Sequence, residues 1–461
     1  MTGSDMAEYN IIYGPPGTGK TTRLLDIVEY EMGEMNVPAD KIAFVTFTRR
    51  GAFEGINRAA TKFNLPYEAF PYFKTLHSFA LAGNKRKVMT PQQLYTFGDK
   101  TGLSLRPNDS GDDSLYMDYI ELYRNNRLAA APLLEHLDGN RILWIMKQYK
   151  KYKETFALVD FTDMIERYEG PAPVDVAIID EAQDLTTLQW SMVHKAFGHC
   201  KRIYIAGDDD QAIFEWSGAD VNAFLNLHGH TETLSKSYRL PDNLVKYAMN
   251  ITGFISNRVN KEYHGNGSKG IVETVSRLDA IYLNRNESYL MLARNQSHLH
   301  LFQEWLEKMN VPYLLNGEPI VNDKDYRAVV EWERIRREGS ISQKDEYMFS
   351  RIRKPGTDIS QPWYDVFDWD DSKIIYMRDR IANGQTAEVP KINLSTIHKV
   401  KGGEADNVIM LTDISKQTKL SLDIMPDSEH RVFYVGATRA KKTLTIVYPQ
   451  TRNYYQYFES L

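Results

Sequence analysis

The chain has 461 residues, of which 25% are charged and 42% hydrophobic, and 56 Lys and Arg against 61 Asp and Glu give a net charge of −5. This length is too great for one hydrophobic core, so we expect two or more domains. No run of about 18 apolar residues occurs and Cys200 is the only cysteine, which excludes a membrane-spanning helix, an internal disulfide and a cysteine-based zinc cluster. Because the N-terminus also lacks a secretory signal pattern, we expect a cytoplasmic protein.

Five short apolar runs that end in glycine or polar residues predict the strands of a first sheet. They lie at 9–14, 41–48, 73–81, 174–180 and 202–208. Helix-like segments such as TTRLLDIVEYEM alternate with them, a pattern typical of a parallel sheet covered by helices on both faces. In such sheets ligands bind at the carboxyl ends of the strands, so we expect the functional residues there.

A second β/α set follows residue 240 and comprises the runs GIVETV, YLMLAR, KINLSTIH, NVIMLTDI, RVFYVGAT and KTLTIVY. Charged, helix-like sequence interrupts the first set, and polar sequence dotted with tryptophan interrupts the second. The predicted fold class is therefore α/β, with two parallel-sheet domains in tandem, each with a mainly helical or irregular insertion. The predicted segments are 1–81 and 156–235 for the first domain, 82–155 for its insertion, 236–319 and 391–461 for the second domain, and 320–390 for its insertion.

GPPGTGKT at 14–21 follows a strand-like run and precedes a helix-like one, so it fits the G-x-x-x-x-G-K-[ST] phosphate loop in the required context. Its glycines allow backbone N–H groups to approach phosphates closely, and the start of the helix adds a favourable dipole. We expect Lys20 to contact the β- and γ-phosphates and Thr21 to bind Mg²⁺. The predicted nucleotide contacts are Gly14, Pro15, Gly17, Thr18, Gly19, Lys20, Thr21 and Thr22.

An acidic pair follows the apolar run of VDVAIIDEAQD at 174–184. We expect Asp180 to hold the hydration shell of the metal, and Glu181 to polarise the water that attacks the γ-phosphate. A kinase transfers phosphate to a hydroxyl and would gain nothing from the adjacent glutamate. The pair therefore favours nucleotide hydrolysis.

Eight motifs occur in the order found in superfamily 1 helicases. They are GPPGTGKT, FVTFTRRGA, FKTLHSF, IIDEAQDLT, GDDDQAIFEWSGAD, LSKSYRL, INLSTIHKVKGGEADNVIML and RVFYVGATRAKK. The chain resembles the UvrD/Rep/PcrA branch of these DNA helicases, as a compact, phage-type member with short insertions. The resemblance implies two RecA-like P-loop domains that bind ATP and Mg²⁺ in the cleft between them.

The resemblance also implies roles for residues outside the phosphate loop. Arg239 and Arg439 match two arginine fingers of the second domain, which stabilise the charge that spreads over the transferring phosphoryl group. Gln211 matches a glutamine that senses the γ-phosphate and links it to the DNA side. Tyr238 matches a tyrosine that stacks on adenine, and Glu404 a glutamate near the ribose.

Six residues fall on or beside the DNA contacts of the family, namely Phe47, His77, Phe214, Trp216, Thr396 and His398. Aromatic stacking suits movement along any sequence, because every base has a π-face. Within GDDDQAIFEWSGAD, we expect Asp208 beside the water shell of the metal, with Asp209 and Asp210 as turn or capping residues. Phe214 and Trp216 would face the bases.

Two positions depart from the family pattern. The glutamine that reads adenine upstream of the phosphate loop has no counterpart among the 13 residues before Gly14, so other nucleoside triphosphates are candidate substrates. The usual K-G-L-E-F is K-G-G-E-A at 401–405, which loosens an apolar contact.

The resemblance implies an ATP-dependent DNA helicase that moves 3′ to 5′ on single-stranded DNA and acts at junctions of single and double strands, with replication or repair proteins as partners. A single-strand translocase that remodels protein complexes with little unwinding is the alternative. RNA remains open as a substrate, because stacking does not distinguish the two sugars. A nucleotide-gated binding module without hydrolysis is disfavoured, because such a module has no use for a full catalytic set.

Overall fold

The computed structural model describes residues 8–81, 86–106, 113–126, 137–284, 286–382 and 390–460. The chain forms two compact units. The first comprises Met1–Arg239 and Ser256–His264, and the second comprises Leu240–Ile255 and Gly265–Leu461. No helix within these described ranges is long and apolar enough to cross a membrane.

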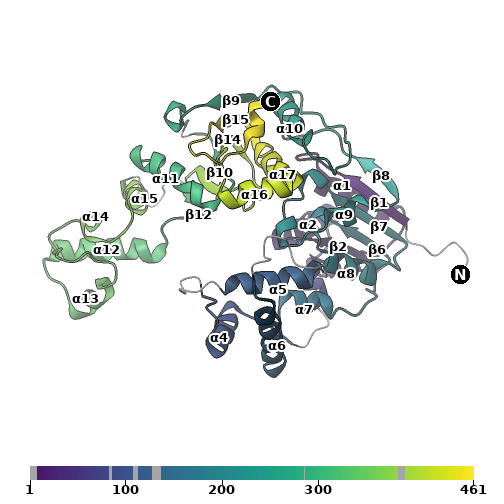
Figure 1. The fold of residues 1–461 in the computed structure, drawn as a ribbon, viewed down its shortest axis with the longest axis horizontal. Coiled ribbons are helices and arrows are strands. Elements are labelled where there is room, and N and C mark those ends of the chain that lie inside the picture. Colours follow the sequence, from purple (N-terminus) through teal and green to yellow (C-terminus); the bar gives the residue numbers. More distant parts are fainter. Residues whose placement is uncertain are drawn as a thin grey trace, which may run out of the picture. The chain divides into compact units, whose positions relative to one another are not determined.

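The first unit is built on a six-stranded parallel sheet (Figure 1). Its strands are β1 (Glu8–Tyr13), β2 (Ile42–Thr46), β3 (Phe73–Thr75), β6 (Val176–Ile179), β7 (Arg202–Gly207) and β8 (His230–Thr233). They are arranged in the order β3-β2-β6-β7-β1-β8, and every neighbouring pair is parallel. The run at 73–81 forms only the short β3 before the chain turns into a helix.

Two hydrophobic clusters cover the two faces of this sheet. The helices are α1 (Lys20–Gly33), α2 (Arg49–Phe63), α3 (Leu76–Leu81), α7 (Phe161–Glu166), α8 (Thr187–Phe197) and α9 (Val221–Leu225). Ile11 of β1 belongs to the cluster formed with α3, α7 and α8, whereas the adjacent Ile12 belongs to the cluster formed with α1 and α2. Successive side chains of a strand point to opposite faces, so a sheet buried on both sides needs such continuous apolar strands. The parallel sheet expected from the sequence is confirmed, and β8 adds a strand outside the five predicted runs.

A helical insertion with its own small core follows β3. It contains α4 (Pro91–Thr101), α5 (Ser114–Asn126) and α6 (Gly139–Thr155), and β4 (Lys87–Val88) pairs in parallel with β5 (Leu158–Val159). Phe97, Ile120 and Ile145 are buried at its centre. Arg124 of α5 contacts Asp160 at 2.8 Å and Asp163 at 2.7 Å, so an ion-pair network joins the insertion to α7.

The second unit contains a seven-stranded sheet in the order β12-β11-β13-β10-β14-β15-β9, in which only the β11–β12 pair is antiparallel. The strands are β9 (Ile271–Val275), β10 (Tyr289–Ala293), β11 (Leu314–Leu315), β12 (Glu318–Pro319), β13 (Ile392–Thr396), β14 (Ala405–Leu411) and β15 (Ala440–Val447). Its helices are α10 (Asp242–Thr252), α11 (Leu299–Lys308), α16 (Lys416–Ile424) and α17 (Pro426–Ala437).

The run RVFYVGAT lies at the end of α17 rather than in a strand. Every residue from Glu429 to Ala437 is buried, and the stretch from Val432 to Ala437 contains no charged residue. A helix that is apolar on all sides lacks the 3.6-residue periodicity that distinguishes it from a buried strand.

Residues 320–390 contribute a second helical insertion in the described ranges, made of α12 (Asp323–Glu338), α13 (Gln343–Phe349), α14 (Trp363–Val366) and α15 (Asp371–Ala382). Figure 1 shows α12, α13 and α14 side by side. Trp332 is fully buried, with Phe349 and Phe367 packed against it at ring-centroid distances of 5.2 and 5.8 Å. The tryptophan-dotted sequence therefore forms a separate aromatic core.

The division between the units differs from the expected boundary between residues 235 and 236. Residues 236–239 belong to the first unit, and so does the later segment Ser256–His264. Backbone hydrogen bonds join the two segments, because Ser237 N–H donates to the carbonyl of His264 at 2.8 Å and His264 N–H donates to that of Ser235 at 2.7 Å.

Candidate active site

The phosphate-loop sequence connects β1 to α1 in a conformation that only glycine readily adopts at two positions. Gly17 has a φ of 74° and Gly19 has a φ of 82°, both in the left-handed region. A Cβ atom on Gly17 would also lie 2.5 Å from the Cβ of Arg239. Both the turn and the close approach of a neighbouring segment therefore require glycine at position 17.

The start of α1 is open for an anion. The helix begins at Lys20, and no described side chain caps it. The first N–H groups of a helix lack partners within the helix and attract negative charge. Lys20 Nζ donates to the carbonyl of Gly14 at 2.9 Å, and Thr18 Oγ1 donates to that of Pro15 at 2.8 Å. The loop thus folds around its own lysine.

Asp180 and Glu181 follow β6 at the same edge of the sheet. Asp180 is buried, and this burial raises its pKa to about 7; the charge of Glu181 acts in the same direction, whereas that of Lys20 acts against it. Glu181 has a φ of 55°, which is strained for a residue with a side chain. Such strain is typical of functional positions.

Gln183 joins the acidic pair to the next strand, a link that the sequence analysis missed. Its Nε2 donates to Glu181 Oε2 at 2.6 Å, and its Oε1 accepts from the backbone N–H of Asp208 at 3.1 Å. A Cβ on Gly207 would lie 2.6 Å from Gln183 Oε1, so the glycine makes room for this contact. Gln183 is fully buried within η4 (Ala182–Asp184).

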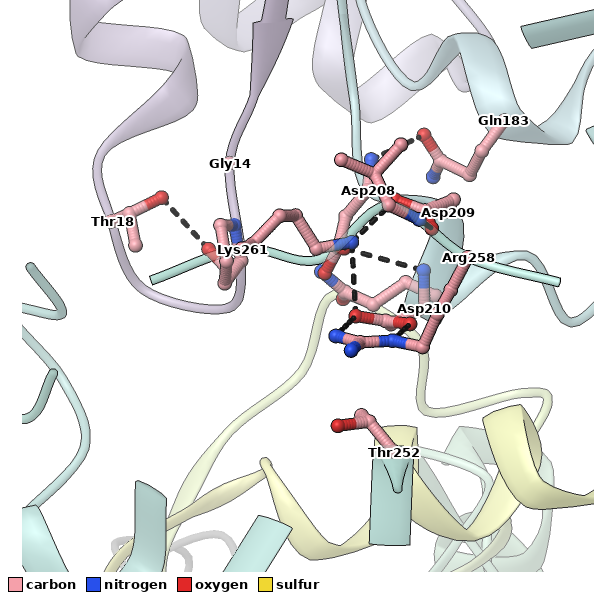
Figure 2. Close-up of polar contacts among 12 residues, drawn as sticks. Gly14, Thr18, Gln183, Asp208, Asp209, Asp210, Thr252, Arg258 and Lys261 are labelled. Atoms are coloured by element: carbon pink, nitrogen blue, oxygen red, sulfur yellow. Dashed lines mark hydrogen bonds and ion pairs between the residues drawn. The ribbon is translucent and has the colours of Figure 1, made fainter. Parts of the chain in front are cut away.

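Three consecutive aspartates after β7 surround a buried lysine, as Figure 2 shows. Lys261 Nζ lies 3.0 Å from Asp208 Oδ1 and 2.9 Å from Asp210 Oδ2, and it also pairs with Asp209. Arg258 adds a two-pronged contact to Asp210, with both N–O distances at 2.7 Å. Burial alone would lower the pKa of Lys261, but the charges of the aspartates outweigh it and raise the pKa.

The structure gives the three aspartates ion pairs that the sequence does not predict. The carboxylate oxygens of the three residues lie within 4.8 Å of one another, a geometry that could hold a metal ion. Lys261 supplies a counter-charge at this cluster, and Asp208 contacts its ammonium group. The expected place of Asp208 beside the water shell of the metal stays a prediction. Asp209 and Asp210 do lie in the turn η5 (Asp209–Gln211), but they also carry buried ion pairs.

Gln211 is fixed by the first of these aspartates. Its Nε2 donates to Asp208 Oδ2 at 2.7 Å, and the residue is 5% exposed. Asp208 thus accepts from Gln211 on one oxygen and contacts Lys261 with the other.

The motif SYRL reaches the phosphate loop within the first unit. Tyr238 N–H donates to the carbonyl of Gly17 at 2.8 Å, and Ser237 Oγ donates to that of Pro16 at 3.1 Å. The Tyr238 side chain is 73% exposed. Arg239, expected as part of the second domain, follows directly and packs on Gly17 as part of the first unit.

The aromatic candidates of the first unit lie beyond the ends of its strands. Phe47 stacks on Phe214 with ring centroids 5.9 Å apart, and Trp216 is 61% exposed. His77 on α3 makes an edge contact with Phe161, and burial lowers the pKa of its imidazole. Phe47 and Phe214 therefore form a pair, which sequence spacing alone does not predict.

Four candidates belong to the second unit, namely Thr396, His398, Glu404 and Arg439. Arg439 is 2% exposed, and its Nε donates to the carbonyl of Val435 at 2.8 Å. Glu404 pairs with Lys441 at 2.5 Å, and Thr396 is a buried residue at the end of β13. Contacts or strands of the second unit therefore place Thr396, Glu404 and Arg439.

Comparison with protein families agrees with this arrangement. The model of the UvrD/REP helicase N-terminal domain matches residues 4–232, and that of the UvrD-like helicase C-terminal domain matches residues 373–451. The chain belongs to the UvrD/REP helicase family. The phosphate loop, the acidic pair and the aspartate turn all fall within the N-terminal match.

Several curated proteins are similar to this UvrD/REP family member. DNA helicase II of Haemophilus influenzae is 24% identical over 358 residues, which cover 67% of this chain and 49% of that protein. The ATP-dependent DNA helicase PcrA of Leuconostoc citreum is 22% identical over 356 residues, covering 67% and 48%. The chain thus spans about half the length of these relatives. Among solved structures, the helicase nonstructural protein 10 of an arterivirus aligns with 96% of this chain and 60% of its own, at 11% identity and a TM-score of 0.38.

Proposed function

We propose that this UvrD/REP family member is an ATP-dependent DNA helicase that moves 3′ to 5′ along single-stranded DNA. One observation supports it above the others. The phosphate loop, the Asp180–Glu181 pair and the Gln211 turn follow three adjacent strands of one sheet, and the exposed Trp216 comes five residues after Gln211. The segment from Gln211 to Trp216 thus combines a side chain suited to contact the nucleotide with an aromatic ring suited to stack on a base. The direction of movement follows from the family alone.

The phosphate loop is proposed to bind ATP. Its backbone N–H groups and the start of α1 would hold the phosphates, and Lys20 would exchange the carbonyl of Gly14 for phosphate oxygens. Tyr238, whose ring is exposed, would stack on the base, and Glu404 would contact the ribose.

Thr21 and Asp180 are proposed to hold Mg²⁺. A hydroxyl and a carboxylate are the hard oxygen donors that this ion prefers, and a buried carboxylate with a raised pKa gains from an adjacent cation. When bound, the ion would neutralise charge on the β- and γ-phosphates.

Hydrolysis itself needs a positioned water. Glu181 would accept hydrogen bonds from that water and polarise it, with Gln183 holding the carboxylate in place. Gln211 would sense the γ-phosphate, and Arg239 and Arg439 would stabilise the charge that develops on the transferring group.

Single-stranded DNA and its junctions with duplex DNA are the proposed partners. Trp216 and the Phe47–Phe214 pair would stack on bases, and His77, Thr396 and His398 would line the same path. Replication or repair proteins are the proposed protein partners.

The test measures ATP hydrolysis with single-stranded DNA, duplex DNA and RNA as activators, with Lys20→Ala as the inactive reference. The proposal expects the strongest stimulation by single-stranded DNA, and loss of hydrolysis in Lys20→Ala. Duplexes with a 3′ or a 5′ tail then determine direction and unwinding. Stimulation without strand separation would favour the translocase alternative, and equal stimulation by RNA would widen the substrate class. Absence of any stimulation would contradict the proposal.

A further inference from the structure

The segment Ser256–His264 returns to the first unit after the chain has already entered the second at Leu240. This segment lies outside the phosphate-loop, acidic-pair and arginine motifs. It nevertheless contacts two parts of the candidate active site, the aspartate turn and the phosphate loop.

Lys261 is the main contact to the aspartate turn. Its side chain is 1% exposed and meets three carboxylates that are themselves buried. A charge removed from water in this way is stable only when it is paired, so the lysine and the aspartates depend on one another. Arg258 and the backbone N–H of Val259, which donates to Asp209 Oδ2 at 2.8 Å, complete the contact.

Lys261 also reaches Gln211 through a single intermediate. Asp208 contacts Lys261 with Oδ1 at 3.0 Å and accepts from Gln211 with Oδ2 at 2.7 Å. Because a carboxylate is planar and rigid, fixing one of its oxygens fixes the direction of the other. The lysine thereby orients the acceptor on which the Gln211 side chain depends.

Tyr263 forms the contact to the phosphate loop, two residues further along. Its hydroxyl is buried and donates to the carbonyl of Pro16 at 2.6 Å. Ser237 Oγ donates to the same carbonyl, so two hydroxyl groups fix the loop directly before Gly17.

We propose that Lys261 is a positioning residue for Gln211, and that Lys261 and Tyr263 together keep the Gln211 turn and the phosphate loop in one fixed arrangement. The proposal rests on the proposed ATP hydrolysis. It assigns a role to residues outside the motifs that indicated the family. The response of Gln211 to nucleotide would then depend on Lys261, which contacts neither Gln211 nor the nucleotide.

The test must separate positioning from folding, because Lys261→Met alone leaves buried carboxylates without their cation. Adding Asp209→Asn solves this problem, since the double variant keeps the net charge of the cluster while the Lys261–Asp208 contact is still lost. We expect the double variant to melt close to the wild type and to keep its KM for ATP within about twofold, with kcat in single-stranded DNA about tenfold lower. Lys201→Met, at an exposed position of the same unit, is the control.

Combination with Gln211→Ala gives the decisive comparison. The triple variant combines Lys261→Met, Asp209→Asn and Gln211→Ala. If Lys261 acts through Gln211, its kcat is no lower than that of Gln211→Ala alone, because the effects of substitutions that act through the same residue do not add. If the loss of kcat in the triple variant equals the product of the losses in the double variant and in Gln211→Ala, the proposal is overturned. A double variant that has both the melting temperature and the kcat of the wild type would also overturn it.

Tyr263→Phe tests the other end of the segment with little risk to folding. Removing one hydroxyl should raise the KM for ATP about threefold and weaken ADP binding in calorimetry to a similar extent. Unchanged nucleotide binding would contradict the role of the tyrosine. A wild type that does not hydrolyse ATP would instead contradict the proposed function, so the two failures are distinguishable.

Discussion

Gln183 Oε1 accepts a hydrogen bond from the backbone N–H of Asp208 at 3.1 Å, and this contact joins the loops that follow two neighbouring strands. The same side chain donates to Glu181 at 2.6 Å. The proposed catalytic glutamate and the turn that carries Gln211 are therefore connected by one buried amide. A movement of either loop must be accommodated by the other.

Replacing this amide tests the connection. Gln183→Ala leaves the Asp208 N–H buried without its acceptor, and we expect a loss of about 1–3 kcal/mol in the free energy of unfolding together with lower ATP turnover. Gln189→Ala is a matched control, because Gln189 is a buried amide whose Oε1 accepts from Thr186 N–H at the start of α8. Gln189→Ala should lower the free energy of unfolding by a similar amount and leave ATP turnover unchanged. Equal turnover in the two variants would argue against the connection.

Glu181→Gln tests the proposed base. The amide keeps the size of the side chain but cannot accept a proton, so we expect ATP to bind with similar affinity and kcat to fall by about 10²–10⁴-fold. Nucleotide titration and steady-state kinetics measure the two quantities. Glu154→Gln, at an exposed position of α6, serves as the control. Unchanged turnover in Glu181→Gln would remove the residue from the proposed mechanism.

Trp216→Ala tests the proposed stacking surface. Loss of an exposed ring that stacks on a base should weaken single-stranded DNA binding by about 1–3 kcal/mol and reduce DNA-stimulated hydrolysis more than basal hydrolysis. Trp216→Phe keeps a π-face and should restore most of the binding. Tyr282→Ala, at an exposed aromatic of the second unit, should have no such effect. DNA affinity that is unaltered in Trp216→Ala would assign the ring a structural role.

His430 gives the second unit a stability that depends on pH. Burial lowers the pKa of its imidazole to about 4, and its Nδ1 shares a hydrogen bond of 2.8 Å with Tyr455 Oη. The unfolded chain binds a proton below about pH 6.5 whereas the folded state does not, so stability is complete above that pH and falls as the pH decreases toward 4. We expect a loss on the order of 2 kcal/mol across this window.

Denaturant unfolding at pH 7.5 and at pH 4.5 checks this expectation. His430→Gln removes the titrating group and should flatten the pH profile, although the variant is less stable throughout. His300, which is exposed, provides the control substitution His300→Gln. A profile that keeps its slope in His430→Gln would assign the acid sensitivity to other groups.

Local patterns in the sequence were sufficient to predict the two sheets and the phosphate loop. A strand that is buried on both faces, as β6 is, must be continuously apolar, and a loop with φ values like those of Gly17 and Gly19 must contain glycine. Both requirements act within a few neighbouring residues. They are therefore visible in a short stretch of sequence.

The contacts that the sequence did not predict depend on distant partners. Lys261 lies more than 50 residues after the aspartates that it pairs with, and nothing in its neighbourhood distinguishes it from an exposed lysine. Gln183 lies within a recognised motif, but only the fold brings it to Asp208. The RVFYVGAT run predicts a strand but lies at the end of α17, because burial of every residue from Glu429 to Ala437 removes the periodicity typical of a helix.

The return of Ser256–His264 to the first unit has a practical consequence for dividing this protein. A fragment that stops at Arg239 contains the whole first sheet and every residue of the N-terminal family match. It lacks Lys261 and Arg258, so three buried aspartates would be left without either cation. The shortest gene segment that encodes the whole first unit therefore extends to His264 and includes α10.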